Sequence, residues 1–379
     1  MALRDYLEKA RRRSPGELAG ELGRRFRTVT MLERALGGRA FAPYAVSFWV
    51  TRRCNLDCYM CWVAAAKGHE GAAYLRADEE LTLDELKSVI DDIKRWRPRI
   101  GVTGGEPFLR RDTLDFLTCI KACGLRCGVN TNGTYLARDA AALVAMGLDS
   151  IMVSVDGPPE VHDRVRRLPG SFERARAGIA AVLDERRRRG TPTPYVKLTC
   201  TVTDQNLPHL AEATAAFQDL PIDEFTFQHR WFTNAATAAA QRRLFAALFS
   251  QETTYLEGFV AGTIPPLDVA ALEEERRRVL AAAWPFAVNF YPDLRDGELT
   301  TFYQDPTRAL RRPCFSRWLR LDILPWGGIT PCLGLELGNV RQMPLTRIWR
   351  SGGYREFRRQ LAKRGFFPGC ARCCGLFSD

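Results

Sequence analysis

The sequence has few lysines, no long apolar run and fewer acidic than basic residues. Only seven of its 55 basic residues are Lys and 48 are Arg, against 44 Asp and Glu, which gives a formal net charge of +11. No run of about 18 apolar residues occurs, which excludes a transmembrane helix. The N-terminus, MALRDYLEKARRR, is too charged for the apolar core of a signal peptide, so we expect a cytoplasmic protein.

The composition is otherwise that of a globular protein. Hydrophobic residues make up 46% of the 379 residues and charged residues 26%, which excludes a disordered or fibrous chain. The Arg residues form scattered runs such as 186–189 and 276–278 without interleaved aromatics. This pattern favours solvated helix faces and makes a nucleic-acid partner unlikely, although a basic surface also permits contact with an acidic membrane.

Cysteine is the unusual residue here, with 12 copies. Cytosolic thiols stay reduced, so clustered cysteines in such a protein are typical of metal binding or redox chemistry rather than of disulfides.

From about residue 45 the chain alternates β-rich runs with helical patterns. The expected strands are 45–51, 99–104, 127–132, 150–157, 195–202 and 224–230, and their apolar character predicts strands covered on both faces. The expected helices include one that begins after Thr82, where Glu85 completes a capping box, and others at 111–123, 136–147, 171–189 and 207–219. Six such repeats predict an α/β fold, a partial (β/α)6 barrel with a parallel sheet.

Four regions follow from this pattern. Residues 1–44 are expected to form an N-terminal helical extension and 45–235 the barrel core. Residues 236–305 read as a helical bridge interrupted by a turn at 262–266, and 306–379 as a cap rich in Pro, Gly, Trp and Cys.

The strongest motif is C-x3-C-x2-C directly after the first strand, formed by Cys54, Cys58 and Cys61. Three thiolates on one loop can hold three corners of an iron–sulfur cluster, and no fourth Cys follows nearby. Structural zinc sites use four protein ligands, so zinc suits this loop poorly.

This motif resembles that of the radical S-adenosylmethionine (SAM) enzymes, and the resemblance spans residues 45 to about 230. It implies a 4Fe–4S cluster whose open iron is chelated by SAM, an external one-electron donor of the flavodoxin or ferredoxin type, and cleavage of SAM to a 5′-deoxyadenosyl radical that abstracts hydrogen from a substrate. The family commonly places an aromatic residue at the position of Met60, and Met is soft and apolar enough to contact the adenine.

The same resemblance implies further SAM contacts at strand ends. The turn Gly104-Gly105-Glu106-Pro107 matches the family's GGE motif, which holds the SAM amino group. The other implied contacts are Asn130 and Asn132 at the end of the third strand, Ser154 and Asp156 at the end of the fourth, and Arg166 near the SAM carboxylate. The carboxyl ends of barrel strands are where chemistry usually sits, which favours these assignments.

A second cysteine set lies near the C-terminus, at Cys314, Cys332, Cys370 and Cys373, with Cys374 adjacent. It is similar to the SPASM/twitch region behind many radical SAM cores. Because the chain ends six residues after Cys373, we expect one auxiliary 4Fe–4S cluster, as in the shorter twitch type. The alternatives are a structural zinc site and a role for Cys374 in place of Cys373.

The remaining candidates favour structural roles. Cys119, Cys123, Cys127 and Cys200 are expected to be buried small hydrophobes. Among the histidines only His229 ends a barrel strand, and a structural role is favoured there over substrate contact.

These features predict a radical SAM oxidoreductase that oxidises a small natural-product intermediate, because an auxiliary cluster can take a second electron from the substrate. The short segment before the first strand argues against a leader-peptide recognition domain. The alternatives are a peptide maturase that forms a crosslink, an enzyme acting on a lipid at an acidic membrane, and, remotely, a non-catalytic zinc- and nucleic-acid-binding protein.

Overall fold

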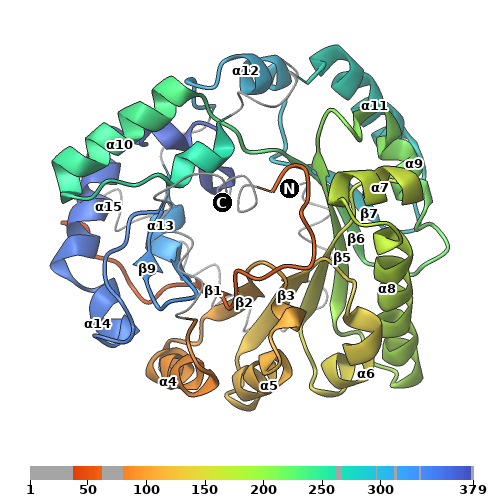
Figure 1. Ribbon diagram of the computed structural model, residues 1–379, viewed down its shortest axis with the longest axis horizontal. Coiled ribbons are helices and arrows are strands. Elements are labelled where there is room, and N and C mark those ends of the chain that lie inside the picture. The colour runs from red at the N-terminus through yellow and green to blue at the C-terminus, as the bar shows by residue number, and fades with distance from the viewer. Residues whose placement is uncertain are drawn as a thin grey trace.

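The computed structural model describes residues 37–61, 80–260, 267–295, 297–310, 314–332 and 334–376. Most of the expected N-terminal extension, His69 and the turn at 262–266 lie outside these residues. Figure 1 shows the described elements as a ring, with a curved sheet on one side and helices around its outer edge.

The six expected strands are all present and pair in parallel, each with its neighbour along the chain. They are β1 (Ala45–Trp49), β2 (Arg99–Thr103), β3 (Arg126–Thr131), β4 (Ser150–Ser154), β5 (Tyr195–Val202) and β6 (Glu224–His229). The expected α/β partial barrel is therefore confirmed.

The sheet is longer than the six repeats predicted. In the described residues it has nine strands, in the order β7-β6-β5-β4-β3-β2-β1-β8-β9. β7 (Ala287–Tyr291) extends it parallel to β6, and β8 (Arg320–Ile323) pairs in parallel with β1 and antiparallel with β9 (Ile329–Thr330). These strands of two to five residues lie in regions whose composition reads as helical or irregular, so no periodicity marked them.

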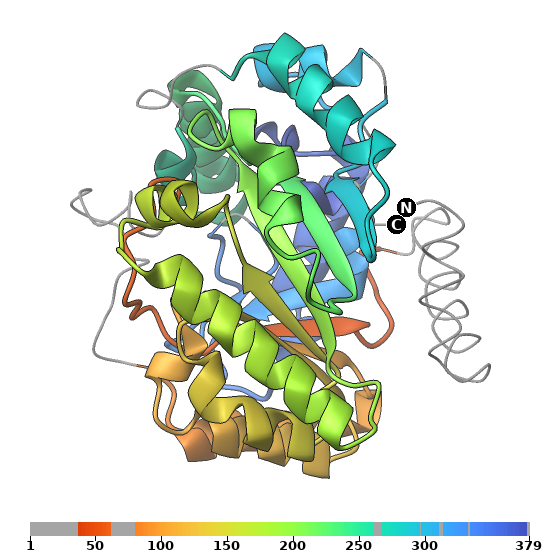
Figure 2. The same ribbon diagram turned by 90° about the vertical axis from the view of Figure 1, so that its right-hand side faces the viewer.

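The helices between the strands cover the outer face of the sheet (Figures 1 and 2). They are α4 (Leu83–Ile93), α5 (Thr113–Ala122), α6 (Leu136–Ala145), α7 (Pro159–Arg166), α8 (Ser171–Arg188) and α9 (Leu210–Ala215). The predicted capping box of α4 is confirmed, since the Thr82 hydroxyl accepts from the Glu85 N–H at 3.2 Å and the Glu85 carboxylate accepts from the Thr82 N–H at 2.7 Å.

The two faces of the sheet differ, which corrects the expectation that strands would be covered on both. In β1, β2 and β4 buried residues alternate with half-buried ones, and the buried set, including Phe48, Val102 and Val153, packs with the helices in the main core. The inner face carries small or polar side chains such as Ser47, Thr103 and, on β3, the exposed Asn130. Strand alternation explains this, since the apolar residues needed for the helix-facing side fill every second position.

The rest of the chain completes the ring (Figure 1). It contributes α10 (Ala235–Phe249), the 3-10 turn η5 (Tyr255–Phe259), α11 (Val269–Ala281), α12 (Glu298–Gln304), α13 (Ser316–Leu319), α14 (Leu345–Trp349) and α15 (Gly352–Arg364). A second apolar core forms here and includes Trp318, Phe357 and Phe367. None of the helices in the described ranges is both long and apolar enough to cross a bilayer.

Candidate functional site

The cysteine loop follows β1 and lies at the carboxyl end of the parallel strands. Cys54, Cys58 and Cys61 are all half-buried. Burial raises the pKa of the Cys58 thiol to about 11, and the positive charge of Arg166 opposes that rise. A metal centre that withdraws charge from sulfur would therefore be needed to keep this thiol ionised at neutral pH.

Gly104 and Gly105 pack directly against the start of this loop. The Gly105 N–H donates to the Thr51 carbonyl and the Glu106 N–H donates to the Arg53 carbonyl, both at 2.8 Å. A Cβ on Gly104 would lie 2.3 Å from the Thr51 oxygen, and one on Gly105 would lie 2.3 Å from the Arg53 oxygen. Only glycine permits this approach, so the two glycines fix the path of the chain into Cys54.

Glu106 is fully buried and its carboxylate is largely occupied by the protein. Its Oε1 accepts from the Phe108 N–H at 3.1 Å and from the Thr131 hydroxyl at 2.8 Å, while Oε2 accepts from the Asn132 N–H at 2.7 Å. Burial raises its pKa, and these hydrogen bonds oppose the rise. Because a carboxylate has about four acceptor positions, one remains on Oε2 for a ligand.

Asn132 joins the end of β3 to the cysteine loop. Its amide nitrogen donates to Asn55 Oδ1 at 2.9 Å and lies 4.0 Å from Cys54 Sγ, while its Oδ1 accepts from the Thr134 hydroxyl at 2.7 Å. Asn55 in turn donates to the same hydroxyl at 3.1 Å. Asn130, two residues earlier, makes no such contact and stands exposed on the inner face.

Arg166 reaches the loop from the end of α7. Its Nε forms a buried ion pair with Asp156 Oδ2 at 2.6 Å, and its Nη1 donates to Cys58 Sγ at 3.7 Å. Asp156 Oδ1 also accepts from the Thr201 N–H at 2.9 Å. Asp156 is completely buried, so its carboxylate positions Arg166 rather than facing the space inside the barrel.

The other predicted SAM contacts lie around the same loop. Ser154 ends β4 on the half-buried inner side, and Met60 is half-buried in the loop itself. Pro107 is buried and begins the 3-10 turn η3 (Pro107–Leu109), so it anchors the turn rather than facing outward.

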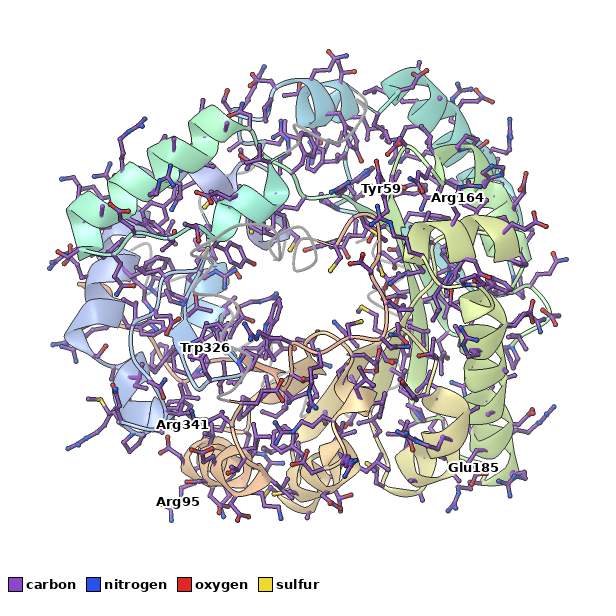
Figure 3. All side chains as sticks on the ribbon, viewed as in Figure 1. Tyr59, Arg95, Arg164, Glu185, Trp326 and Arg341 are labelled. Carbon is purple, nitrogen blue, oxygen red and sulfur yellow. The ribbon has the colours of Figure 1, made fainter. Side chains whose placement is uncertain are left out.

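Sequence reasoning did not single out Tyr59 of the cysteine loop or the two residues that contact it, Asp204 and Arg230. The Tyr59 hydroxyl donates to Asp204 at 2.9 Å, and the Arg230 guanidinium lies 6.0 Å from the centre of the Tyr59 ring. Figure 3 shows Tyr59 and Trp326 on opposite sides of the ring's central region. The only signal in the sequence is their position: Tyr59 lies inside the cysteine motif, Asp204 lies two residues after β5, and Arg230 directly follows β6.

The C-terminal cysteines gather in the second core, where Cys314, Cys332 and Cys370 are buried. The Cys370 and Cys332 thiols share a hydrogen bond, Cys370 also interacts electrostatically with Cys314 and Cys373, and Cys314 interacts with Cys332 and Cys373. The Phe367 N–H donates to Cys370 Sγ at 3.4 Å and the Gly375 N–H donates to Cys373 Sγ at 3.3 Å. Four thiols from distant parts of the chain therefore meet in one buried place.

Cys374 differs from its neighbour. It is exposed whereas Cys373 is half-buried, and the two thiols share a hydrogen bond. This geometry favours Cys373 as the fourth member of the set.

Burial was expected for all four remaining cysteines and is found for two of them. Cys127 and Cys200 are buried in the main core, while Cys119 and Cys123 are half-buried. His229 faces the helices, with its Nδ1 2.8 Å from the Tyr303 hydroxyl. Burial, together with the charge of Arg276, lowers its pKa to about 3.

Each set has the number of thiols that an iron–sulfur cluster uses. Among the described residues no three Cys, His, Asp or Glu side chains converge at the spacing of one metal ion. A zinc ion draws its sulfur ligands to about 2.3 Å, whereas a 4Fe–4S cluster binds each thiolate at a different iron. Three thiols on one loop and four in the second core match an open cluster and a fully cysteine-ligated cluster.

Comparison with known proteins agrees with both sets. Residues 50–212 match the model of the Radical SAM superfamily, and residues 314–374 match an iron–sulfur cluster-binding domain, SPASM. The chain is 27% identical to the AdoMet-dependent heme synthase of Nitratidesulfovibrio vulgaris over 87% of this chain and 86% of that protein. It is 30% identical to the Fe-coproporphyrin III synthase of Methanosarcina barkeri over 79% of this chain and 72% of that protein.

The fold also matches solved structures. Streptococcus suis SuiB bound to S-adenosylmethionine superposes with a TM-score of 0.59 at 14% identity, covering 88% of this chain and 71% of that one. The two matched domains of this chain imply SAM, a 4Fe–4S cluster and an auxiliary iron–sulfur centre in the C-terminal domain as its cofactors. The chain belongs to the radical SAM superfamily and carries a C-terminal SPASM-type cluster-binding domain.

Proposed function

We propose that this enzyme oxidises a polar small molecule by two electrons, beginning with removal of a hydrogen atom from an unactivated C–H bond. The reduced SAM-binding cluster supplies the electron that cleaves SAM to methionine and the 5′-deoxyadenosyl radical. The radical then takes one hydrogen atom from the substrate, and the resulting substrate radical loses one electron and one proton. The electron passes to the auxiliary cluster and the proton to a base.

Within this proposal Cys54, Cys58 and Cys61 bind the first cluster. Arg166, fixed by Asp156 beside Cys58, supplies a permanent positive charge for the SAM carboxylate. The remaining acceptor position on Glu106 suits the SAM ammonium group. Further SAM contacts are proposed at Met60, Gly104, Gly105, Pro107, Asn130, Asn132 and Ser154, all of which belong to the loop or to adjoining strand ends and turns.

The observation that carries the oxidative outcome is the meeting of three buried thiols and the half-buried Cys373 in the C-terminal region. We assign Cys314, Cys332, Cys370 and Cys373 as ligands of one auxiliary 4Fe–4S cluster. With every iron ligated by protein, such a cluster has no open position for substrate and is suited to electron transfer.

The inner face of the sheet supports a polar substrate. Its side chains near the carboxyl ends of the strands include Thr103, Asn130 and Ser154. A polar inner surface can make hydrogen bonds to hydroxyl and amino groups, while burying it against a lipid chain would leave those groups unpaired. A lipid substrate is accordingly less favoured.

Two other substrate classes have specific support. Relatives matched over most of their length are named for haem and coproporphyrin synthesis, which favours a porphyrin as the second candidate. A peptide remains the third, since the matched fold of SuiB also occurs bound to a precursor peptide and a mycofactocin maturase is 30% identical over half of this chain.

We further propose that the chain works in the cytoplasm with a flavodoxin or ferredoxin as electron donor. The four-part division at residues 44, 235 and 305 also stays a proposal. The sheet crosses two of those boundaries, because β7 and β8 join it from the bridge and the cap.

The test uses anaerobically reconstituted enzyme with SAM, a reductant and three probe sets: amino sugars, iron coproporphyrin III and short peptides. We expect 5′-deoxyadenosine together with a product lighter by two hydrogen atoms. The C370A variant should still form 5′-deoxyadenosine but lose the oxidised product, while C374A should retain both. Equal oxidised product from C370A and wild type would contradict the proposal.

A further inference from the structure

Arg317, in α13, is a buried cation with few partners of its own. Its side chain is about one-tenth exposed, and its Nε and Nη1 donate no hydrogen bond among the described residues. The nearest acidic group is Asp322, whose Oδ2 lies 3.6 Å from Nη1, beyond hydrogen-bonding distance. Burying a guanidinium in this way is costly unless negative charge lies nearby.

The auxiliary thiols provide that negative charge once they are ionised. Arg317 interacts electrostatically with Cys332, Cys373 and Cys314. A Cβ built on Gly375 would lie 3.4 Å from Cys373 Sγ and 3.5 Å from Arg317 Nη2, so the thiol and the guanidinium flank the same point. An arginine guanidinium is not deprotonated in proteins. The side chain is therefore charged.

We propose that Arg317 is the buried counter-cation of the auxiliary cluster and that its charge makes this cluster easier to reduce. The inference rests on the proposed function, because it assumes that the four thiols hold an iron–sulfur cluster. Reduction adds one negative charge to the cluster, and a fixed positive charge nearby stabilises the reduced state more than the oxidised one. Net charge and nearby polar groups are established determinants of cluster potentials. This bias favours transfer of an electron from the substrate to the cluster.

Asp322 acts in the opposite direction. It is about one-quarter exposed and lies beside Arg317, so its negative charge partly offsets that of the guanidinium. Removing the charge of Arg317 should lower the reduction potential of the cluster, and removing the charge of Asp322 should raise it. Two small substitutions at neighbouring residues therefore have opposite expected signs, which a general loss of packing would not produce.

The experiment isolates the auxiliary cluster in a background that lacks the first one, C54A/C58A/C61A. In this background R317M, R317K and D322N are reconstituted without oxygen and titrated with reductant, and the reduced cluster is followed by electron paramagnetic resonance. At a fixed potential we expect the reduced-to-oxidised ratio of R317M to fall roughly tenfold, which equals about 59 mV for one electron. R317K should stay near the parent, and D322N should shift towards the reduced form.

The control is R359M, which removes one positive charge from the exposed side of α15 and should leave the titration unchanged. An unchanged ratio in R317M, or shifts of the same sign in R317M and D322N, would overturn the inference. If R317M loses the auxiliary iron, retention in R317K at the parent potential supports the counter-cation, and loss in both variants overturns it. A background protein that binds no iron with Arg317 intact would instead refute the auxiliary cluster itself.

Discussion

Gly105 shows at the scale of one residue why the GGE turn has its sequence. A Cβ at this position would lie 2.3 Å from the Arg53 carbonyl oxygen. Because that oxygen belongs to the backbone, it cannot move aside as the end of a flexible side chain could. We expect G105A to displace the cysteine loop and to reduce iron from about eight to about four per chain after anaerobic reconstitution. The matched control is G352A at the start of α15, where an added Cβ meets nothing within 4 Å. Equal iron in G105A and wild type would show that the loop does not depend on this close approach.

His229 gives a residue-scale test by pH. Its pKa is about 3 in the folded protein because it is buried, against about 6.5 when solvated. Below about pH 6.5 the unfolded chain therefore binds a proton that the folded chain does not, so acidification lowers stability. We expect the buried, neutral His229 to lower the free energy of unfolding by about 2 kcal/mol when the pH falls from 7 to 5.

Denaturant unfolding at both pH values should accordingly show a weaker acid dependence in H229Q than in wild type. The control is H209Q, because His209 is partly exposed beside Glu212. If H229Q and wild type lose the same stability on acidification, His229 does not stay neutral in the fold.

The residues that the sequence predicted belong to local motifs, whereas the missed residues act through contacts between distant positions of the chain. The cysteine loop, the GGE turn and Arg166 could be located from the sequence because they follow motifs or strand ends. The supporting contacts of Tyr59 with Asp204 and of Arg317 with the auxiliary thiols join positions far apart in the chain. No local spacing reports such contacts, so the sequence alone could not reveal them.

At the scale of elements, the contact between α4 and α14 attaches the C-terminal region to the barrel. The Asp92 carboxylate accepts from the Thr346 N–H at 2.9 Å and from its hydroxyl at 2.8 Å. Nearby, Arg341 donates a hydrogen bond to the Glu85 carboxylate, and this hydrogen bond is the main cause that lowers the pKa of Glu85 to about 2.

We expect D92A to reduce the free energy of unfolding by about 1–3 kcal/mol, because it leaves the half-buried Thr346 donors unpaired. Asp91 provides the control on the same helix, since it pairs only with Lys94 at the surface and D91A should cost less than about 0.5 kcal/mol. Denaturant unfolding measures both variants. Similar losses in D92A and D91A would mean that the Asp92–Thr346 contact does not stabilise the assembly of the two regions.

The strands and helices of the six repeats were predictable because each is long enough to show its periodicity, and α4 also carries its capping box. The short strands β7 and β8 were not, because they are defined by pairing with β6 and β1 rather than by their own residues. The alternation of buried and half-buried positions in β1 was visible in AVSFW, yet its apolar Trp49 obscured the polar inner face.

At the scale of the whole molecule, pairing of β8 with β1 joins the C-terminal domain to the first strand of the barrel. The two cysteine sets therefore belong to one continuous sheet and its attached cores, one at the carboxyl end of β1 and the other around α13, directly before β8. This arrangement allows one chain to hold both the SAM-binding cluster and an auxiliary cluster.

The most direct test of two clusters is the iron, sulfide and zinc content of protein reconstituted without oxygen. We predict about eight irons and eight sulfides per chain in wild type, about four of each in C54A/C58A/C61A, and no zinc. About four irons with one zinc in wild type would contradict the auxiliary cluster and the oxidative function that depends on it.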